Sequence, residues 1–183
     1  MRLRIGEKAP PMRLDGIDGK TFDSADLNGR RYLLSFFRFA SCPFCNLRVH
    51  QLVSRQSELG SGFPVIAVFN SSLDNLRRHA KKHEAPFPIL ADPKRVYYQA
   101  YRVEKSLAGV FAGMVKRMPT LLHAMFAKGY WPTSPGGSVT SMPADFLIDE
   151  SGVIRTAYYG NDEGDHLPFE QIRSFARENA AGQ

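Results

Sequence analysis

The chain has 183 residues and a formal net charge of +6, and its hydrophobic fraction of 43% excludes wholesale disorder. This length favours one domain over residues 1–183, and no apolar run approaches the roughly 18 residues of a transmembrane helix. For lack of such an apolar run we expect no membrane span. Basic residues are scattered rather than gathered in one run, so we expect no nucleic acid among the partners.

The first half of the chain alternates turn, strand and helix patterns. Residues 15–20 contain Asp-Gly corners typical of a hairpin, and the run 31–39 is apolar with little alternation, which predicts a central strand buried on both faces. Apolar residues then recur at helical spacing, which predicts an amphipathic helix that ends before Gly60. A second strand at 64–70 and a polar surface helix at 73–84 follow.

The second half continues this alternation. We expect a short strand at 89–90, a helix from Asp92 through Tyr101, and two strands at 144–149 and 153–159 that form an antiparallel hairpin. A closing helix is predicted from about Pro168 to Ala181. Together these elements predict an α/β fold with a central mixed β-sheet sandwiched by helices.

The segment 103–142 does not fit this rhythm and is predicted to be a helical insertion. Two apolar stripes indicate a broken helical hairpin, and the Pro- and Gly-rich residues 132–138 predict a mobile loop. We expect the stripes to cover one edge of the core. The alternatives are a self-association surface, as in a homodimer, and a lid over the cysteines. The stripes consist of Leu107, Val110, Phe111, Met114, Val115 and Met118, and of Leu121, Leu122, Met125 and Phe126.

The two cysteines, Cys42 and Cys45, are too few for a disulfide scaffold, and their spacing indicates a reactive or metal-binding pair. Cys42 precedes a helix that begins at Pro43, where unpaired backbone N–H groups favour a thiolate. Cys45 begins the apolar face of that helix. We therefore expect Cys42 to be the exposed nucleophile of low pKa, and Cys45 the shielded resolving thiol.

Residues around the pair are candidates for the same site. Arg38 adds positive charge if its side chain points toward the cysteines; the alternative is a structural ion pair. Most of the nearby phenylalanines are core residues, but one or two could wall the thiols in an apolar pocket suited to a hydrophobic substrate. The predicted pocket residues are Phe39, Ser41 and Phe44.

The segment 37–47 resembles the active-site segment of the alkyl hydroperoxide reductase/thiol-specific antioxidant (AhpC/TSA) group, in its peroxiredoxin-like branch with a Cys-Pro-x-Cys motif. The likeness extends through 6–10, 18–20, 87–93 and 143–149, which is most of the chain except the insertion. It implies a thioredoxin-like fold in which Pro143 is a cis-proline that faces the cysteines. From the residues alone, the Met142–Pro143 bond could equally be a trans entry into a strand.

The chain also departs from the peroxiredoxin pattern Pro-x-x-x-Thr/Ser-x-x-Cys. Aligned on Cys45, the Pro position holds Arg38 and the Thr/Ser position holds Cys42, which would make Cys45 the peroxidatic residue. Aligned as a thioredoxin, Cys42 is the nucleophile instead. The position of Cys42 before the helix favours the second assignment.

These features predict a thiol-dependent redox enzyme that cycles between a Cys42–Cys45 dithiol and disulfide. It would reduce a hydroperoxide with electrons from a thioredoxin- or glutaredoxin-type donor, without a cofactor, in the cytoplasm. Alternatives with the same pair are a protein thiol-disulfide oxidoreductase and a non-catalytic redox sensor.

Three readings of other residues are weaker. His79 and His83 could complete a zinc site with the cysteines, but the intervening segment is far longer than in a compact zinc finger. A Cys–His hydrolase would use His123 or His166 as its base. The acidic residues of 162–166 lack the spacing of a calcium loop, so we expect an exposed acidic turn.

Overall fold

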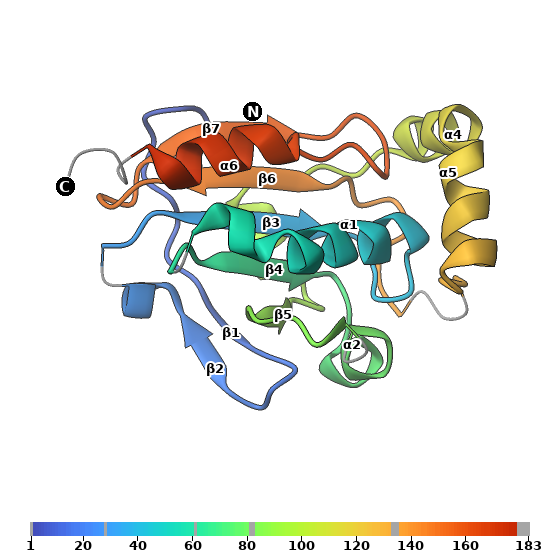
Figure 1. Ribbon diagram of the computed structural model, residues 1–183, viewed down its shortest axis with the longest axis horizontal. Helices are drawn as coiled ribbons and strands as arrows, with labels where there is room; N and C mark the ends of the chain where they lie inside the picture. Colours follow the sequence, from blue (N-terminus) through green and yellow to red (C-terminus); the bar gives the residue numbers. More distant parts are fainter. Residues whose placement is uncertain (1, 28, 61, 81–82, 133–135, 179–183) are drawn as a thin grey trace.

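The computed structural model describes residues 2–27, 29–60, 62–80, 83–132 and 136–178, and it is built on a five-stranded mixed sheet of order β5-β4-β3-β6-β7 (Figure 1). β3 pairs in parallel with β4, and β4 with β5, whereas β6 and β7 run antiparallel to their neighbours. The predicted mixed sheet and its late hairpin are therefore confirmed. Its strands are β3 (Tyr32–Phe37), β4 (Val65–Phe69), β5 (Ile89–Ala91), β6 (Ala144–Ile148) and β7 (Ile154–Tyr159).

A small two-stranded sheet precedes this sheet in the chain. β1 (Arg13–Asp15) and β2 (Thr21–Asp23) pair antiparallel across the turn at residues 16–20, as the two Asp-Gly corners predict. A 3-10 helix, η1 (Ser24–Leu27), then leads to β3. Both faces of β3 are buried, as expected for the central strand.

Helices cover both faces of the sheet, so the protein has two hydrophobic cores. Phe37 points to the face covered by α1 (Pro43–Ser54), α2 (Leu73–Ala80) and α6 (Phe169–Arg177). Phe36, its neighbour in β3, points to the opposite face, where α3 (Val96–Ala100) contributes Tyr98. The thiol pair belongs to the first of these cores.

Several predicted helix bounds differ from the structure: the helix expected at 73–84 is assigned as Leu73–Ala80, and the helix expected from Asp92 through Tyr101 as Val96–Ala100. The helix after the cysteines ends at Ser54 and is followed by a separate 3-10 helix, η2 (Gln56–Leu59), so Gly60 follows the second helix rather than the first. The closing helix ends at Arg177; the predicted continuation through residues 179–181 lies outside the described residues. In the described ranges, no helix combines the length and apolar character that crossing a membrane requires.

The insertion is helical as predicted, but it packs differently. It contains α4 (Leu107–Lys116), α5 (Met118–Leu122) and a π-helix, η4 (His123–Ala127), at the end of the sheet where α1 begins (Figure 1). The expectation that both stripes cover the core is wrong, because α4 packs through Gly109 and Gly113 while its large apolar side chains face outward.

The predicted mobile loop 132–138 is anchored where the structure describes it. The backbone N–H of Ser138 donates to Asn70 Oδ1 at 2.7 Å. A Cβ on Gly137 would lie 1.7 Å from the Asn70 carbonyl oxygen, so this close approach requires glycine. Residues 133–135 lie outside the described residues. The segment 136–139 is thus held at the end of β4, next to the loop that carries the cysteines.

Candidate functional site

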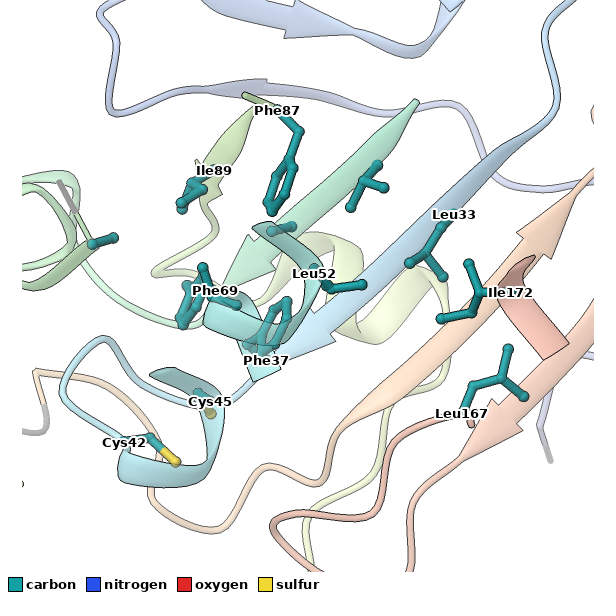
Figure 2. Close-up of a cluster of buried hydrophobic side chains, with 14 of the residues drawn as sticks. Leu33, Phe37, Cys42, Cys45, Leu52, Phe69, Phe87, Ile89, Leu167 and Ile172 are labelled. Atoms are coloured by element: carbon teal, nitrogen blue, oxygen red, sulfur yellow. The ribbon is translucent and has the colours of Figure 1, made fainter. Parts of the chain in front are cut away.

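The two cysteines lie at the start of α1, directly after the loop that leaves β3 (Figure 2). Both side chains are 0% exposed. The prediction of an exposed Cys42 is therefore wrong. The insertion contributes to the packing around the helix that carries the thiols, since α5 and η4 pack against α1 and Leu121 packs against the core that contains both thiols. Such long-range packing leaves no mark in the residues around Cys42.

The N-terminus of α1 surrounds Cys42 with hydrogen-bond donors. Cys42 is the N-cap residue, in an extended conformation with φ −63° and ψ 122°, and Pro43 begins the helix. The backbone N–H groups of Phe44 and Cys45 donate toward the Cys42 sulfur. These are donors that an α-helix leaves unpaired in its first turn, so the helix itself stabilises negative charge on Cys42.

Arg38 contacts both thiols. Its Nη1 lies 3.7 Å from Cys42 Sγ, and its backbone N–H donates to Cys45 Sγ at 3.4 Å. The guanidinium also donates to the carbonyl oxygen of Val139 and lies over the Phe39 ring, 5.3 Å from its centroid. No described carboxylate lies within ion-pair distance of Arg38. The side chain therefore points to the cysteines, which is the first of the two alternatives given for Arg38; the other was a structural ion pair.

The thiol groups differ strongly in acidity. Burial alone would raise the pKa of Cys42, but the hydrogen bond from Cys45, the charge of Arg38 and the backbone N–H groups lower it to about 7. Burial and its hydrogen bond to Cys42 raise the pKa of Cys45 well above its usual value. Cys42 is thus the more acidic of the two thiols, as its position before the first turn of α1 predicts. Which cysteine reacts first stays a prediction.

Asn46 holds the segment 40–42 before α1 in place, although it is not among the predicted site residues. Its Nδ2 donates to the carbonyl oxygens of Ala40, at 2.9 Å, and Cys42, at 2.8 Å, while its Oδ1 lies 2.7 Å from His83 Nε2. Ser71 Oγ accepts from the Ala40 N–H at 3.0 Å. The only signal in the sequence is the position of Asn46 four residues after Cys42, because its side-chain partner His83 comes from a distant segment. His83, a candidate zinc ligand, contacts Asn46 instead.

The acidic turn at 162–165 is partly buried beside the site, so the prediction of an exposed turn is wrong. Asp162 is 4% and Glu163 2% exposed, and Asp162 Oδ1 accepts from Arg117 Nε at 2.6 Å. Burial raises the pKa of Glu163, and the charge of Arg38 opposes this rise. The cause is again the insertion, because α4 packs on this turn through Gly113. Among the described residues, no group of three or more His, Cys, Asp or Glu is placed to hold a metal.

Pro143 enters β6 through a trans peptide bond, since the described residues contain no cis bond. The cis-proline that the resemblance implies at this position is therefore wrong. The Met142 N–H donates to the Glu104 carbonyl oxygen and the Pro143 carbonyl accepts from Gly160, both within 3.0 Å. These bonds extend the pairing beyond the start of β6 and keep the chain extended, as in the trans strand entry that the residues alone allowed.

The predicted pocket residues are buried, and of the two histidines proposed as a hydrolase base, one contacts Asp145 and the other is exposed. Phe39 and Phe44, each 5% exposed, belong to the same core as the thiols, and Ser41 is buried. The substrate pocket that they would form stays a prediction. The candidate bases of a hydrolase bind elsewhere or face outward: His166 Nδ1 lies 3.0 Å from Asp145 Oδ2, and His123 is exposed on η4.

A cavity of about 840 Å³ lies between the β1–β2 hairpin and the segment 84–90. Its lining includes Ile17, Phe22 and Phe87, and it contains neither cysteine. The chemistry of the thiol pair therefore does not take place in this cavity.

Comparison with known proteins supports a redox role. A family model described as AhpC/TSA family matches residues 5–157. The chain is 31% identical over 114 residues to a putative peroxiredoxin of Mycobacterium tuberculosis, a match that covers 59% of this chain and 71% of the relative. It is 29% identical over 108 residues to peroxiredoxin Bcp of Bacillus subtilis, covering 57% and 68%.

A solved structure confirms the expected fold. The crystal structure of peroxidoxin BcpB from Mycobacterium tuberculosis matches with a TM-score of 0.69 at 12% sequence identity, covering 97% of this chain and 98% of that one. At this identity the likeness concerns the fold alone. The five-stranded mixed sheet with flanking helices is the thioredoxin-like fold.

Proposed function

The chain belongs to the AhpC/TSA family, a family of peroxiredoxins and thiol peroxidases, and on that premise we propose that it reduces hydroperoxides through Cys42 and Cys45. The observation that carries this proposal is the environment of Cys42. Its pKa is lowered to about 7 at a helix N-terminus, with Arg38 Nη1 3.7 Å from its sulfur. A thiolate is the nucleophilic form of cysteine, so Cys42 is prepared to react near neutral pH.

The reaction proceeds in two steps on this chain. The Cys42 thiolate attacks one peroxide oxygen, the O–O bond breaks, and the other oxygen leaves as an alcohol or water after taking up a proton. The Cys45 thiol then attacks the resulting sulfenic acid, which releases water and forms the Cys42–Cys45 disulfide. A dithiol donor of the thioredoxin or glutaredoxin type restores both thiols by exchange. The chain has no third cysteine, so a catalytic disulfide within one chain joins these two residues.

The neighbouring residues have matching roles in this proposal. Arg38 stabilises the Cys42 thiolate, while Phe39, Ser41 and Phe44 line the approach of the peroxide, and Pro143 borders it from the start of β6. Since both sulfurs are buried, a peroxide reaches them only when the segments packed over the start of α1 open. A reducing compartment such as the cytoplasm would keep the pair in its reactive dithiol form.

One observation favours a second candidate, a protein thiol-disulfide oxidoreductase. Arg38 and Cys42 stand where the peroxiredoxin pattern has its proline and hydroxyl residue. A Cys-x-x-Cys pair with its first thiol at a helix N-cap and of low pKa is also the arrangement that attacks disulfides. In this reaction Cys42 attacks a substrate disulfide and Cys45 resolves the mixed disulfide.

A peroxidase assay coupled to thioredoxin and its reductase tests the proposal, with cumene hydroperoxide as substrate and reduction of insulin disulfides as the parallel assay. We expect the wild type to consume the peroxide and Cys42→Ser to be inactive. Cys45→Ser should complete a single turnover and accumulate a sulfenic acid that a dimedone probe labels.

The two variants also decide the order of attack. If Cys42→Ser still forms a sulfenic acid while Cys45→Ser does not, the roles of the two cysteines are reversed. Faster reaction with insulin than with peroxide would favour the oxidoreductase. Slow turnover in both assays, together with a partner affinity that depends on the disulfide, would favour a redox sensor. Absence of thiol loss with either oxidant would overturn the enzymatic proposal.

A further inference from the structure

Helix α4 docks onto the protein through its glycines. A Cβ on Gly109 would lie 2.7 Å from the Asn161 carbonyl oxygen, and one on Gly113 would lie 2.3 Å from Glu163 Oε2. These distances are shorter than side chains tolerate, so glycine is what lets the helix backbone approach the turn 161–164. The face of α4 that carries Gly109 and Gly113 is therefore packed against the protein.

The face of α4 that carries large apolar side chains is exposed. Leu107, Phe111 and Val115, spaced by four residues on one helix face, are 76%, 72% and 64% exposed. Phe126, at 72%, and Trp131, at 46%, are exposed further along the insertion, with their rings edge to face at 5.3 Å. α5 packs against both α4 and η4, so these side chains belong to consecutive, mutually packed parts of the insertion. We call Leu107, Phe111, Val115, Leu122, Phe126 and Trp131 the insertion surface.

Charges around the insertion surface have one sign. Residues 105–144 contain no Asp or Glu, whereas they contain Lys105, Lys116, Arg117 and Lys128. Arg117 pairs with Asp162 outside the segment. The three lysines are exposed and form no ion pair with a described residue. The insertion surface is thus apolar and aromatic, with positive charges beside it that the segment does not neutralise.

This charge pattern selects among the possible occupants. In a symmetric dimer the same patch faces itself, so the lysines of two copies would meet without a carboxylate from either segment. An anionic bilayer supplies phosphate groups to the lysines and an acyl boundary to the leucines and aromatic rings. Trp and Phe beside Lys are typical of elements that lie in the membrane interface. We propose that the insertion surface binds the protein peripherally to a bilayer that contains anionic lipids.

Trp131 allows a direct test, because it is the only tryptophan of the chain and lies in the insertion surface. The full chain is mixed with vesicles of phosphatidylcholine, with or without phosphatidylglycerol. Binding is followed by co-sedimentation and by tryptophan fluorescence. We expect at least about tenfold tighter binding to the anionic vesicles, with a blue shift of the emission, and weaker binding at high salt.

Variants separate the apolar from the electrostatic contribution. Phe111→Ser should weaken binding about tenfold or more, since a large ring no longer enters the interface. Lys116→Glu should weaken it about fivefold or more on anionic vesicles. The matched controls are Val96→Ser and Lys94→Glu, at exposed positions outside the insertion, and they should bind like the wild type. Circular dichroism and thiol titration show that each variant is folded.

The readout is binding, so it is independent of the proposed peroxidase activity. Absence of co-sedimentation and of any emission shift with anionic vesicles would overturn the inference, and so would equal losses for Phe111→Ser and Val96→Ser. Sedimentation equilibrium supplies the third outcome. A dimer that Phe111→Ser dissociates, together with no vesicle binding, would assign the insertion surface to a second copy of the chain.

Discussion

Arg38 is the residue through which the fold acts on both thiols. Its side chain brings positive charge to Cys42, while its backbone N–H donates to Cys45. The sequence places Arg38 just before the cysteines, but it does not decide where the guanidinium points. The guanidinium is held by the carbonyl oxygen of Val139, which accepts its hydrogen bond and lies near the end of the insertion, about a hundred positions later in the chain.

Arg38→Met should raise the pKa of Cys42 from about 7 by about one unit or more, because an opposite charge at this distance stabilises the thiolate by that amount. At pH 7 the thiolate fraction then falls about fivefold, from about one half to about one tenth, and well below pH 7 it falls about tenfold. Above the pKa of both proteins the rates should converge. The measurement is the rate of iodoacetamide alkylation against pH in a Cys45→Ser background, whose hydroxyl keeps a donor beside Cys42.

Arg78→Met is the matched control, because Arg78 is exposed on α2. It should leave the alkylation profile unchanged. An unchanged Cys42 profile in Arg38→Met would show that the helix N-terminus and Cys45 lower the pKa without Arg38.

Among the elements, α4 shows how a periodic pattern can predict a helix and yet mislead about its orientation. The apolar spacing of 107–118 correctly indicates a helix, and Ser106 caps it by accepting from the Gly109 N–H at 2.9 Å. Periodicity also implies that the apolar face is buried. Here the two glycines set the docked face instead, because only they allow close approach to the turn 161–164.

Gly109→Ala tests this packing. In an exposed helix the substitution would stabilise the protein by about 1 kcal/mol through helix propensity. At Gly109 the new Cβ meets the backbone of Asn161, and such overpacking costs about 1–3 kcal/mol. We therefore expect the free energy of unfolding, measured in urea, to fall by about 1 kcal/mol. A rise of the same size would show that α4 does not dock through this face.

Asp145 connects several layers of the fold. It lies in β6, fully buried, and accepts from Ser35 of β3 and from the Leu167 N–H at 2.7 Å. His166 Nδ1 lies 3.0 Å and Arg48 Nη2 of α1 4.0 Å from Asp145 Oδ2. Burial alone would raise the pKa of Asp145, but these partners lower it to about 2. The carboxylate thereby ties the centre of the sheet to α1 and to the segment before α6.

Removing this charge should destabilise the protein. Asp145→Asn leaves Arg48 buried without its counter-charge, so we expect a loss of about 3 kcal/mol in the free energy of unfolding at pH 7. In the wild type the carboxylate contributes about 2 kcal/mol, present above its unfolded pKa near 4 and lost as the pH falls through about 2. Urea unfolding at pH 7 measures the first effect, and urea unfolding of the wild type between pH 5 and pH 2 measures the second.

Asp26→Asn serves as the control, because Asp26 is exposed in η1. Its unfolding free energy should match that of the wild type at pH 7. Equal stability of Asp145→Asn and Asp26→Asn would contradict the role of the buried carboxylate.

Local patterns were sufficient for much of the fold and for the placement of the cysteine pair at the start of a helix. The run 31–39 predicts a strand because a segment buried on both faces must be continuously apolar, and the structure places β3 there. Cys42 and Cys45 are recognisable because their spacing and the following helix are properties of adjacent residues. The same holds for the late hairpin, whose turn and strands are contiguous in the chain.

Contacts between distant segments decided the rest. The insertion packs against α1, which begins beside the buried Cys42, and α4 packs against the buried Glu163. The Met142 N–H bonds to Glu104, and the Pro143 carbonyl accepts from Gly160. Asn46 acquires its role only when His83 is brought beside it. The cysteine pair and its place before a helix can thus be recognised from neighbouring residues. The burial and acidity of the two thiols follow from tertiary packing, since burial and electrostatic fields are sums over residues that only the folded chain brings together.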